Sequence, residues 1–270
     1  MNIWSYSIFG RDTEKYYKPM IENFELAKSN NVKIIININK DDEQFVKDYF
    51  EDYKDKFILE VHNDFFLSKF PKMLRYIISK KYPNSNFFYK DSDSIVTDDE
   101  INIMNNWLEN EKADYLIIRN HPVHLSPILA GMFAVKYSKI GFLINLVEKF
   151  FNEKNLIKNN IKFTDFDYDQ VFLQIEVYSK ILKQASIYSS HFYFCEENII
   201  QIKFNKNFIG RQGYSDKTEI GNEWYFKLYN NKMLCVPYRH RFYKYYKSDK
   251  IILLLAKIFT LLFLKRSSKE

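Results

Sequence analysis

The chain has 270 residues, a mass of 32.8 kDa and a formal net charge of +6. Its hydrophobic content of 46% is enough to fill a sizeable core, which excludes a disordered chain. The modest net charge gives no reason to expect nucleic acid as a partner, and the two cysteines, Cys195 and Cys235, form neither a disulfide framework nor a zinc motif. The first residues lack the pattern of a secretory signal, so we expect a protein of the reducing cytoplasm.

The first half of the chain alternates short β-rich runs with stretches of helical periodicity. The expected strands are IWSYSIF (3–9), VKIIINI (32–38), FILEV (57–61), NFFYK (86–90) and DYLIIR (114–119). The expected helices between them cover residues 12–30, 41–53, 70–80 and 98–110. Such alternation is typical of βαβ units and predicts a mainly parallel sheet.

The strict alternation fades after residue 120. Helical patterns cover residues 138–154 and 169–184, and short strands follow within 186–194 and 199–205. We therefore predict an α/β, Rossmann-like fold with a mixed, mainly parallel sheet, made by one domain over residues 1–230. A C-terminal extension, residues 231–270, follows this domain.

Two aspartates, Asp91 and Asp93, come directly after the apolar run NFFYK. Ligands of open α/β sheets bind beyond the carboxyl ends of the strands, which is where these side chains would lie. Paired carboxylates suit Mn²⁺ or Mg²⁺, and such ions usually keep positions free for water and phosphate, so a metal-bridged diphosphate is the expected ligand. The alternative is an acidic turn in which Ser92 and Ser94 act as local caps.

A second polar cluster lies in the run IIRNHPVH, residues 117–124. Here the expected strand ends and a proline-containing loop begins, with Arg119, Asn120, His121 and His124. Two histidines at this spacing could bind a metal ion, but no cysteine or glutamate stands at zinc spacing. Hydrogen bonds to a substrate, or within the loop, are the favoured interpretation. Gly131, further along, permits a close approach of the backbone to a sugar or ribose.

A third feature is FDYDQVFL, residues 166–173, in which Asp169 and Gln170 precede Phe172 and Leu173. We expect these two apolar residues, together with Ile175, to be buried. Asp169 is interpreted either as a helix N-cap or as a rigidly held acid that binds an acceptor hydroxyl or acts as a general base.

Four motifs in order resemble bacterial surface-polysaccharide glycosyltransferases of the glycosyltransferase-A type. That family has the pattern RDxDS, RDHPxH, ILGGMW and DQxFL. This chain has KDSDS (90–94), RNHPVH (119–124), PILAGMF (127–133) and DQVFL (169–173), with further echoes in YSIFGRD near the start, PKMLRY (71–76), HFYF (191–194) and FIGR (208–211). The departures are Lys90 for arginine, Asn120 for aspartate, Phe133 for tryptophan and a missing acid in HFYF, so no base role is carried onto Asn120.

The resemblance implies a glycosyltransferase-A domain that uses a nucleotide-sugar donor and Mn²⁺ or Mg²⁺. Asp91 and Asp93, with His191 as a further candidate, would bind the cation, and Asp169 and Gln170 would be the catalytic pair facing the sugar or acceptor. The residues expected to contact donor or acceptor are Phe9, Arg75, Asp91, Ser92, Arg119, His121, His124 and Gly131.

The C-terminal extension combines a basic stretch, RHRFYKYYKSDK (239–250), with an apolar run, IILLLAKIFTLLFL (251–264). Fourteen residues are too few to cross a bilayer, which needs about 20. Basic and aromatic residues beside an apolar helix are typical of in-plane attachment to an anionic leaflet, so we predict peripheral binding to the inner face of the cell membrane; a core helix is the alternative.

The leading hypothesis is a metal-dependent glycosyltransferase of capsule, lipooligosaccharide or other surface-glycan biosynthesis, with a glycan or a lipid-linked glycan as acceptor. A nucleotidyl- or phosphotransferase could use the same carboxylates. A third possibility is a membrane-docked assembly subunit that has the fold without the chemistry.

Overall fold

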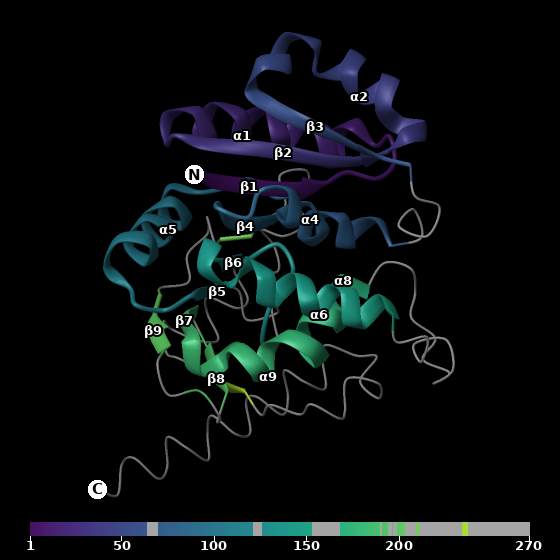
Figure 1. Ribbon diagram of the computed structural model, residues 1–270. Helices are drawn as coiled ribbons and strands as arrows, with labels where there is room; N and C mark the ends of the chain where they lie inside the picture. The colour runs from purple at the N-terminus through teal and green to yellow at the C-terminus, as the bar shows by residue number, and fades with distance from the viewer. Residues whose placement is uncertain are drawn as a thin grey trace, which may run out of the picture.

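The computed structural model describes residues 1–63, 70–120, 126–152, 168–189, 191–193, 196, 199–202, 209–210 and 234–236. Helices cover both faces of a central, twisted sheet in this part of the chain (Figure 1). The predicted α/β fold with a mixed, mainly parallel sheet is confirmed.

The main sheet has eight strands in the order β3-β2-β1-β4-β6-β5-β7-β9. Its strands are β1 (Asn2–Ser7), β2 (Val32–Asn39), β3 (Phe57–His62), β4 (Asn86–Asp91), β5 (Tyr115–Arg119), β6 (Phe133–Val135), β7 (Ala185–Ser189) and β9 (Ile199–Gln201). All neighbours run parallel except β6, which is antiparallel to both β4 and β5. A separate parallel pair joins β8 (His191–Tyr193) to β10 (Leu234–Val236).

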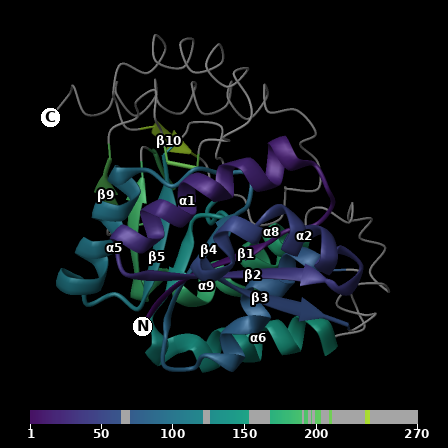
Figure 2. The same cartoon turned by 90° about the horizontal axis from the view of Figure 1, so that it is seen from above.

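The helices divide between two hydrophobic clusters, and Figure 2 shows α1 and α6 on opposite sides of the strands. One cluster packs under α1 (Lys18–Ser29), α2 (Glu43–Tyr49) and α5 (Asp98–Asn110). The other packs under α4 (Leu74–Ile77), α6 (Ile140–Asn152), α8 (Tyr168–Phe172) and α9 (Tyr178–Ile181). Short 3-10 and π turns complete the helical segments: η1 (Thr13–Tyr17), η2 (Lys40–Asp42), η3 (Glu51–Lys56), η4 (Pro71–Met73), η5 (Ile78–Lys81), η6 (Tyr137–Lys139), η7 (Leu173–Val177) and η8 (Leu182–Gln184).

Strand β4 is buried on both faces, and its alternation decides where its polar end points. Phe87 and Tyr89 pack in the cluster under α4 and α6, whereas Phe88 packs edge-on against Trp107 of α5, with ring centroids 5.6 Å apart. Because successive side chains of a strand point to opposite faces, Asp91 follows Tyr89 toward α4, and Lys90 follows Phe88 toward α5.

Most predicted elements are found within a few residues of their expected bounds, and α5 covers the predicted residues 98–110. Strand β6 was not predicted. The prediction that Ile175 is buried is wrong: its side chain is 42% exposed, because η7 is a π turn whose wider winding changes the helical phase after Leu173.

The C-terminal extension lies outside the described residues apart from β10, which pairs with β8 of the domain. In the described part of the chain, no helix is both long and apolar enough to cross a bilayer.

Candidate active site

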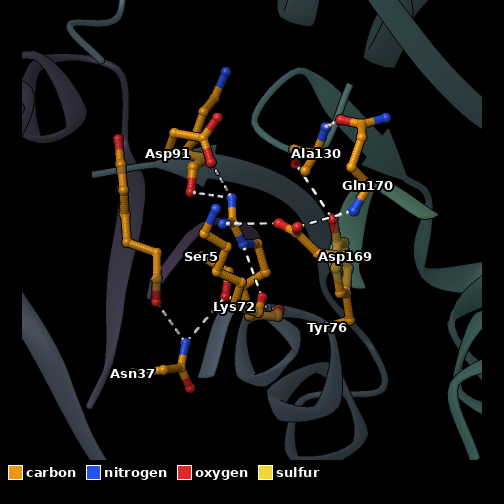
Figure 3. Close-up of polar contacts among 11 residues, drawn as sticks. Ser5, Asn37, Lys72, Tyr76, Asp91, Ala130, Asp169 and Gln170 are labelled. Atoms are coloured by element: carbon orange, nitrogen blue, oxygen red, sulfur yellow. Dashed lines mark hydrogen bonds and ion pairs between the residues drawn. The ribbon is translucent and has the colours of Figure 1, made fainter. Parts of the chain in front are cut away.

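A buried arginine, Arg75, links the two carboxylates that the sequence singled out in separate motifs. Its Nη1 donates to Oδ1 of Asp91 at 2.6 Å, and its Nη2 donates to Oδ2 of Asp169 at 3.3 Å. Figure 3 shows Asp91 and Asp169 close together, with dashed lines that mark these two contacts. Residues from β4 and α8, far apart in the sequence, therefore meet at one point.

The backbone around Arg75 fixes its guanidinium before either carboxylate is considered. Nε donates to the carbonyl oxygen of Lys72 at 3.0 Å, and Nη1 also donates to that of Lys90 at 2.9 Å. Arg75 is only 2% exposed. A guanidinium has five donors in a planar arrangement, so these main-chain contacts set the plane in which it offers the remaining donors.

A line of polar side chains reaches Arg75 from the far edge of the sheet. His62 of β3 contacts Oδ1 of Asn37 in β2 at 3.0 Å, and Nδ2 of Asn37 donates to the Ser5 hydroxyl of β1 at 3.3 Å. Ser5 in turn donates to the carbonyl oxygen of Arg75 at 2.9 Å. Burial lowers the pKa of His62, so this line contains a neutral imidazole at pH 7.

Asp91 is held on one side and exposed on the other. Its side chain is 44% exposed, and although burial alone would raise the pKa of Asp91, the Arg75 guanidinium lowers it below the usual value. A Cβ atom on Gly131 would lie 2.2 Å from Oδ2 of Asp91, so only glycine fits there. Gly131 was expected to make room for a sugar; in this structure it makes room for the carboxylate.

Asp93 lies in the turn after β4, which is closed by a hydrogen bond from the Ser94 amide to the Asp91 carbonyl oxygen at 3.2 Å. Burial and the nearby Asp91 raise the pKa of Asp93 to about 6. Two carboxylates that disfavour each other's charge are stabilised by a cation between them. Ser92, in the same turn, is buried.

Asp169 and Gln170 are engaged with their surroundings through all their polar atoms. Oδ1 of Asp169 accepts from the Gln170 amide at 2.9 Å, and burial raises the pKa of Asp169 above its usual value. The Gln170 side chain donates to the carbonyl oxygen of Ile128 and accepts from the amide of Ala130 at 3.3 Å, as Figure 3 shows for Ala130. Gln170 thus fixes the segment before β6, and the catalytic role of this pair stays a prediction.

Arg119 lies at the carboxyl end of β5, fully buried. Its two terminal nitrogens donate to the two oxygens of Glu196 at 2.9 and 2.8 Å, and Nη1 also donates to the carbonyl oxygen of Pro127. Glu196 accepts a further hydrogen bond from the Tyr178 hydroxyl. A donor or acceptor contact by Arg119 stays a prediction, and the contacts present stabilise the β5 end of the site.

Lys90 and Asn120, at which the chain differs from the pattern that it resembles, both have hydrogen-bond partners within the protein. The ammonium group of Lys90 pairs with Glu100 of α5, both groups being buried. Oδ1 of Asn120 accepts from the backbone amide of Ile209 at 3.0 Å, which joins the end of β5 to a later segment.

The other predicted site residues lie around this centre or beyond the described part. Phe9 is partly buried, two residues after the end of β1. Ser7, the last residue of β1, pairs in register with Asp91, and its buried hydroxyl has no hydrogen-bond partner among the described residues. His121 and His124 lie outside the described residues, and only the backbone of His191, in β8, is described.

Sequence reasoning missed Glu100, Glu196 and Asn37. Glu100 stands three residues after the N-cap Thr97, where a capping glutamate is common, and this local role hides its partner Lys90 on another element. Nothing near Glu196 or Asn37 in the sequence signals their distant partners.

The two carboxylates Asp91 and Asp93 suit a divalent cation that also binds a ligand. Among the residues that the structure describes, no group of three or more His, Cys, Asp or Glu side chains could hold a metal ion. Asp91 and Asp93 supply two carboxylates, and Mg²⁺ is commonly bound by one or two carboxylates plus the phosphates of a substrate. The residues present therefore suit a cation shared with a diphosphate.

No family model matches the sequence, and no curated protein matches it. The structure is similar to a glycosyltransferase involved in the glycosylation of the major capsid of PBCV-1, with 15% identity over 71% of this chain and 83% of that one and a TM-score of 0.41. It is also similar to S. aureus TarS in complex with UDP, with 13% identity over 75% of this chain and 60% of that one and a TM-score of 0.42. A third similar structure is 4-diphosphocytidyl-2C-methyl-D-erythritol synthase from Anaerococcus prevotii, with 13% identity over 84% of this chain and 94% of that one and a TM-score of 0.40. Likeness at this level concerns the arrangement of strands and helices and assigns no activity.

Proposed function

We propose that this chain is a metal-dependent glycosyltransferase that moves a sugar from a nucleotide-diphosphate sugar to a glycan or lipid-linked glycan in surface-glycan biosynthesis. The observation that carries the proposal is the meeting of Asp91, at the carboxyl end of β4, with Asp169 on one buried arginine. Two motifs of the resemblance that are 78 residues apart in the chain meet on this arginine, next to the turn that bears Asp93, and this supports a single site.

In the proposed reaction, Asp91 and Asp93 hold Mn²⁺ or Mg²⁺ against the donor diphosphate. The bound cation would offset the negative charge that develops on the leaving nucleotide diphosphate as the glycosidic bond breaks. Asp93 is mostly deprotonated at pH 7, since its pKa is raised only to about 6, and is therefore ready to bind a cation.

Arg75 and Gln170 give this site its rigidity. Arg75 keeps the Asp91 carboxylate turned so that part of it is exposed, and Gln170 fixes the backbone of residues 128–130 beside Gly131. Asp169 is 3% exposed, so we propose that it acts on the sugar or acceptor from within this framework rather than as a solvent-exposed base.

The test combines a donor panel with one matched pair of variants. Purified protein is incubated with nucleotide sugars, UDP-GlcNAc among them, with Mn²⁺ or with a chelator, and nucleotide release and product mass are measured. Asp93→Asn should abolish metal-dependent turnover, whereas Asp98→Asn should not. Asp98 is an exposed carboxylate in the first turn of α5, so the control removes the same charge five residues away.

Release that persists unchanged in the chelator or in Asp93→Asn would refute the metal role. A product carrying a phosphoryl or nucleotidyl group instead of a sugar would replace the proposal with the alternative transferase. Peripheral membrane binding by residues 231–270 is a separate proposal, tested by sedimentation of the full chain with anionic vesicles at low and high salt.

A further inference from the structure

An asparagine on α1 contacts the main chain of the turn that carries Asp93. Asn23 is fully buried. Its Nδ2 donates to the carbonyl oxygen of Ser94 at 2.9 Å, and its Oδ1 accepts from the amide of Val96 at 2.9 Å. One side chain therefore satisfies two backbone groups that lie one and three residues after Asp93.

The chemistry of the amide explains why asparagine occupies this position. Its side chain has one acceptor and one donor group on a short stem, the combination that a neighbouring strand would offer to the residues after β4. After Asp91 the chain leaves the main sheet and turns toward α5, and Ser94 forms an isolated β-bridge within this turn. Asn23 adds hydrogen bonds to the Ser94 carbonyl oxygen and from the Val96 amide, supplied by a helix.

Further hydrogen bonds hold the turn at its start and at its end. At the start, Ser94 is bonded back to the Asp91 carbonyl oxygen at 3.2 Å. At the end, the Thr97 hydroxyl accepts from the Glu100 amide at 3.3 Å and begins α5. Between these points, Asn23 is the side chain from another element that bonds to the described backbone of residues 94–96.

Packing of α1 on the sheet does not require an amide at this place. Other buried residues of the helix, Met20, Phe24 and Ala27, belong to the cluster under α1 and make its apolar contact. A buried polar side chain among them is costly unless both its groups are bonded, so its position is explained by the turn and not by the helix.

We propose that Asn23 is a positioning residue that orients Asp93 toward the divalent cation of the donor complex. The inference rests on the proposed function, because it assigns Asn23 a part in that metal site. Asn23 acts through the backbone of the turn and touches neither cation nor donor.

The test measures Mn²⁺ and UDP binding to the full chain by titration calorimetry and by the Mn²⁺ resonance signal. Asn23→Leu has a similar volume and lacks both hydrogen-bonding groups. We expect it to bind the Mn²⁺–UDP pair at least tenfold more weakly per folded molecule. In the Asp93→Asn background the same change should have no further effect, because the residue whose orientation it sets is already lost.

The matched control is Asn86→Leu, at the other end of β4. Asn86 also bonds through both amide groups, donating to Oδ1 of Asn2 at 2.9 Å and accepting from the Tyr137 amide at 3.0 Å. It should bind Mn²⁺ and UDP within twofold of the unmodified chain. If Asn23→Leu does not fold, Asn23→Asp keeps the acceptor for the Val96 amide and should fold with an intermediate loss of affinity.

The outcomes separate the two proposals. Wild-type affinity in a folded Asn23 variant, in a chain whose binding needs Asp93, overturns the role of Asn23 and leaves the proposed function standing. A purely structural asparagine would lower thermal stability equally in both backgrounds and leave affinity unchanged, which also overturns it. If the unmodified chain binds no Mn²⁺ with UDP, or binds it equally well without Asp93, the proposed function and this inference fail together.

Discussion

Replacement of Arg75 by methionine should lower the free energy of unfolding, and most of the loss should come from Asp169 and not from Asp91. The side chain is 2% exposed, and methionine fills a similar length of space without charge or donors. Asp169 would then be left as a buried carboxylate without its hydrogen-bonded cation, whereas Asp91 would turn to solvent.

The magnitudes follow from the exposure of each partner, not from the distances. The Asp91 contact is shorter, 2.6 Å against 3.3 Å, but the Asp91 side chain is 44% exposed and that of Asp169 is 4% exposed. Removing one partner of a buried pair costs about 3–5 kcal/mol, while a partly exposed pair contributes at most about 1 kcal/mol. We therefore expect Arg75→Met to reduce the free energy of unfolding by about 3–5 kcal/mol.

A double-mutant cycle in urea checks this assignment. Adding Asp169→Asn to Arg75→Met should recover about 2 kcal/mol or more of the lost free energy of unfolding, because the uncompensated charge is removed. Adding Asp91→Asn should recover less than about 1 kcal/mol. A larger coupling of Arg75 with Asp91 than with Asp169 would refute the view that burial, and not hydrogen-bond length, decides the strength of the two contacts.

Three further changes test neighbouring features. Gly131→Ala would place a Cβ atom 2.2 Å from Asp91, so Mn²⁺–UDP affinity measured by calorimetry should fall at least tenfold, whereas Gly141→Ala, with nothing within 4 Å, should leave it unchanged. His62→Gln should flatten the pH dependence of the free energy of unfolding measured in urea. Because burial lowers the pKa of His62, the neutral imidazole stabilises the fold fully above the unfolded pKa of about 6.5, and this stabilisation is lost as the pH falls below that value. Glu196→Gln leaves the buried Arg119 without its counter-charge and should cost about 3–5 kcal/mol in chemical denaturation, against less than about 1 kcal/mol for Glu148→Gln, whose pair with Lys80 is exposed. Equal losses in the two glutamate variants, a flat wild-type pH profile, or unchanged affinity in Gly131→Ala would each contradict the corresponding argument.

The sequence predicted the elements whose formation depends on local signals. Helix α5 has an N-cap threonine followed by three acids, signals that are local to its own sequence, and its bounds agree with the predicted residues 98–110. Strand β6 was missed because Phe133–Val135 has only three residues and no alternation of polar and apolar side chains. Its identity as a strand comes from its neighbours β4 and β5, which pair with it on both sides.

The candidate site was predicted as a set of separate motifs, and its internal contacts were not. Asp91 was singled out because it follows an apolar run, and Asp169 because it precedes one, and both patterns are visible in one dimension. Arg75 was singled out only as a ligand contact, because its partners lie 16 and 94 residues away and are brought to it by packing. Glu196 and Asn23 have partners more than 70 residues distant, so no local pattern could reveal them.

The direction of β6 has a consequence for how this site could change in evolution or by design. In an all-parallel sheet, each loop at the ligand-binding edge is followed by a segment that crosses back to the opposite edge. Because β6 runs against β5, and the Ile118 amide already bonds to the Met132 carbonyl oxygen, the connection between these strands starts and ends at the same edge. Its length can therefore vary without altering the strand order or any crossover helix, provided that Ile128, which is buried in the core, and Gly131, which makes room for Asp91, are kept.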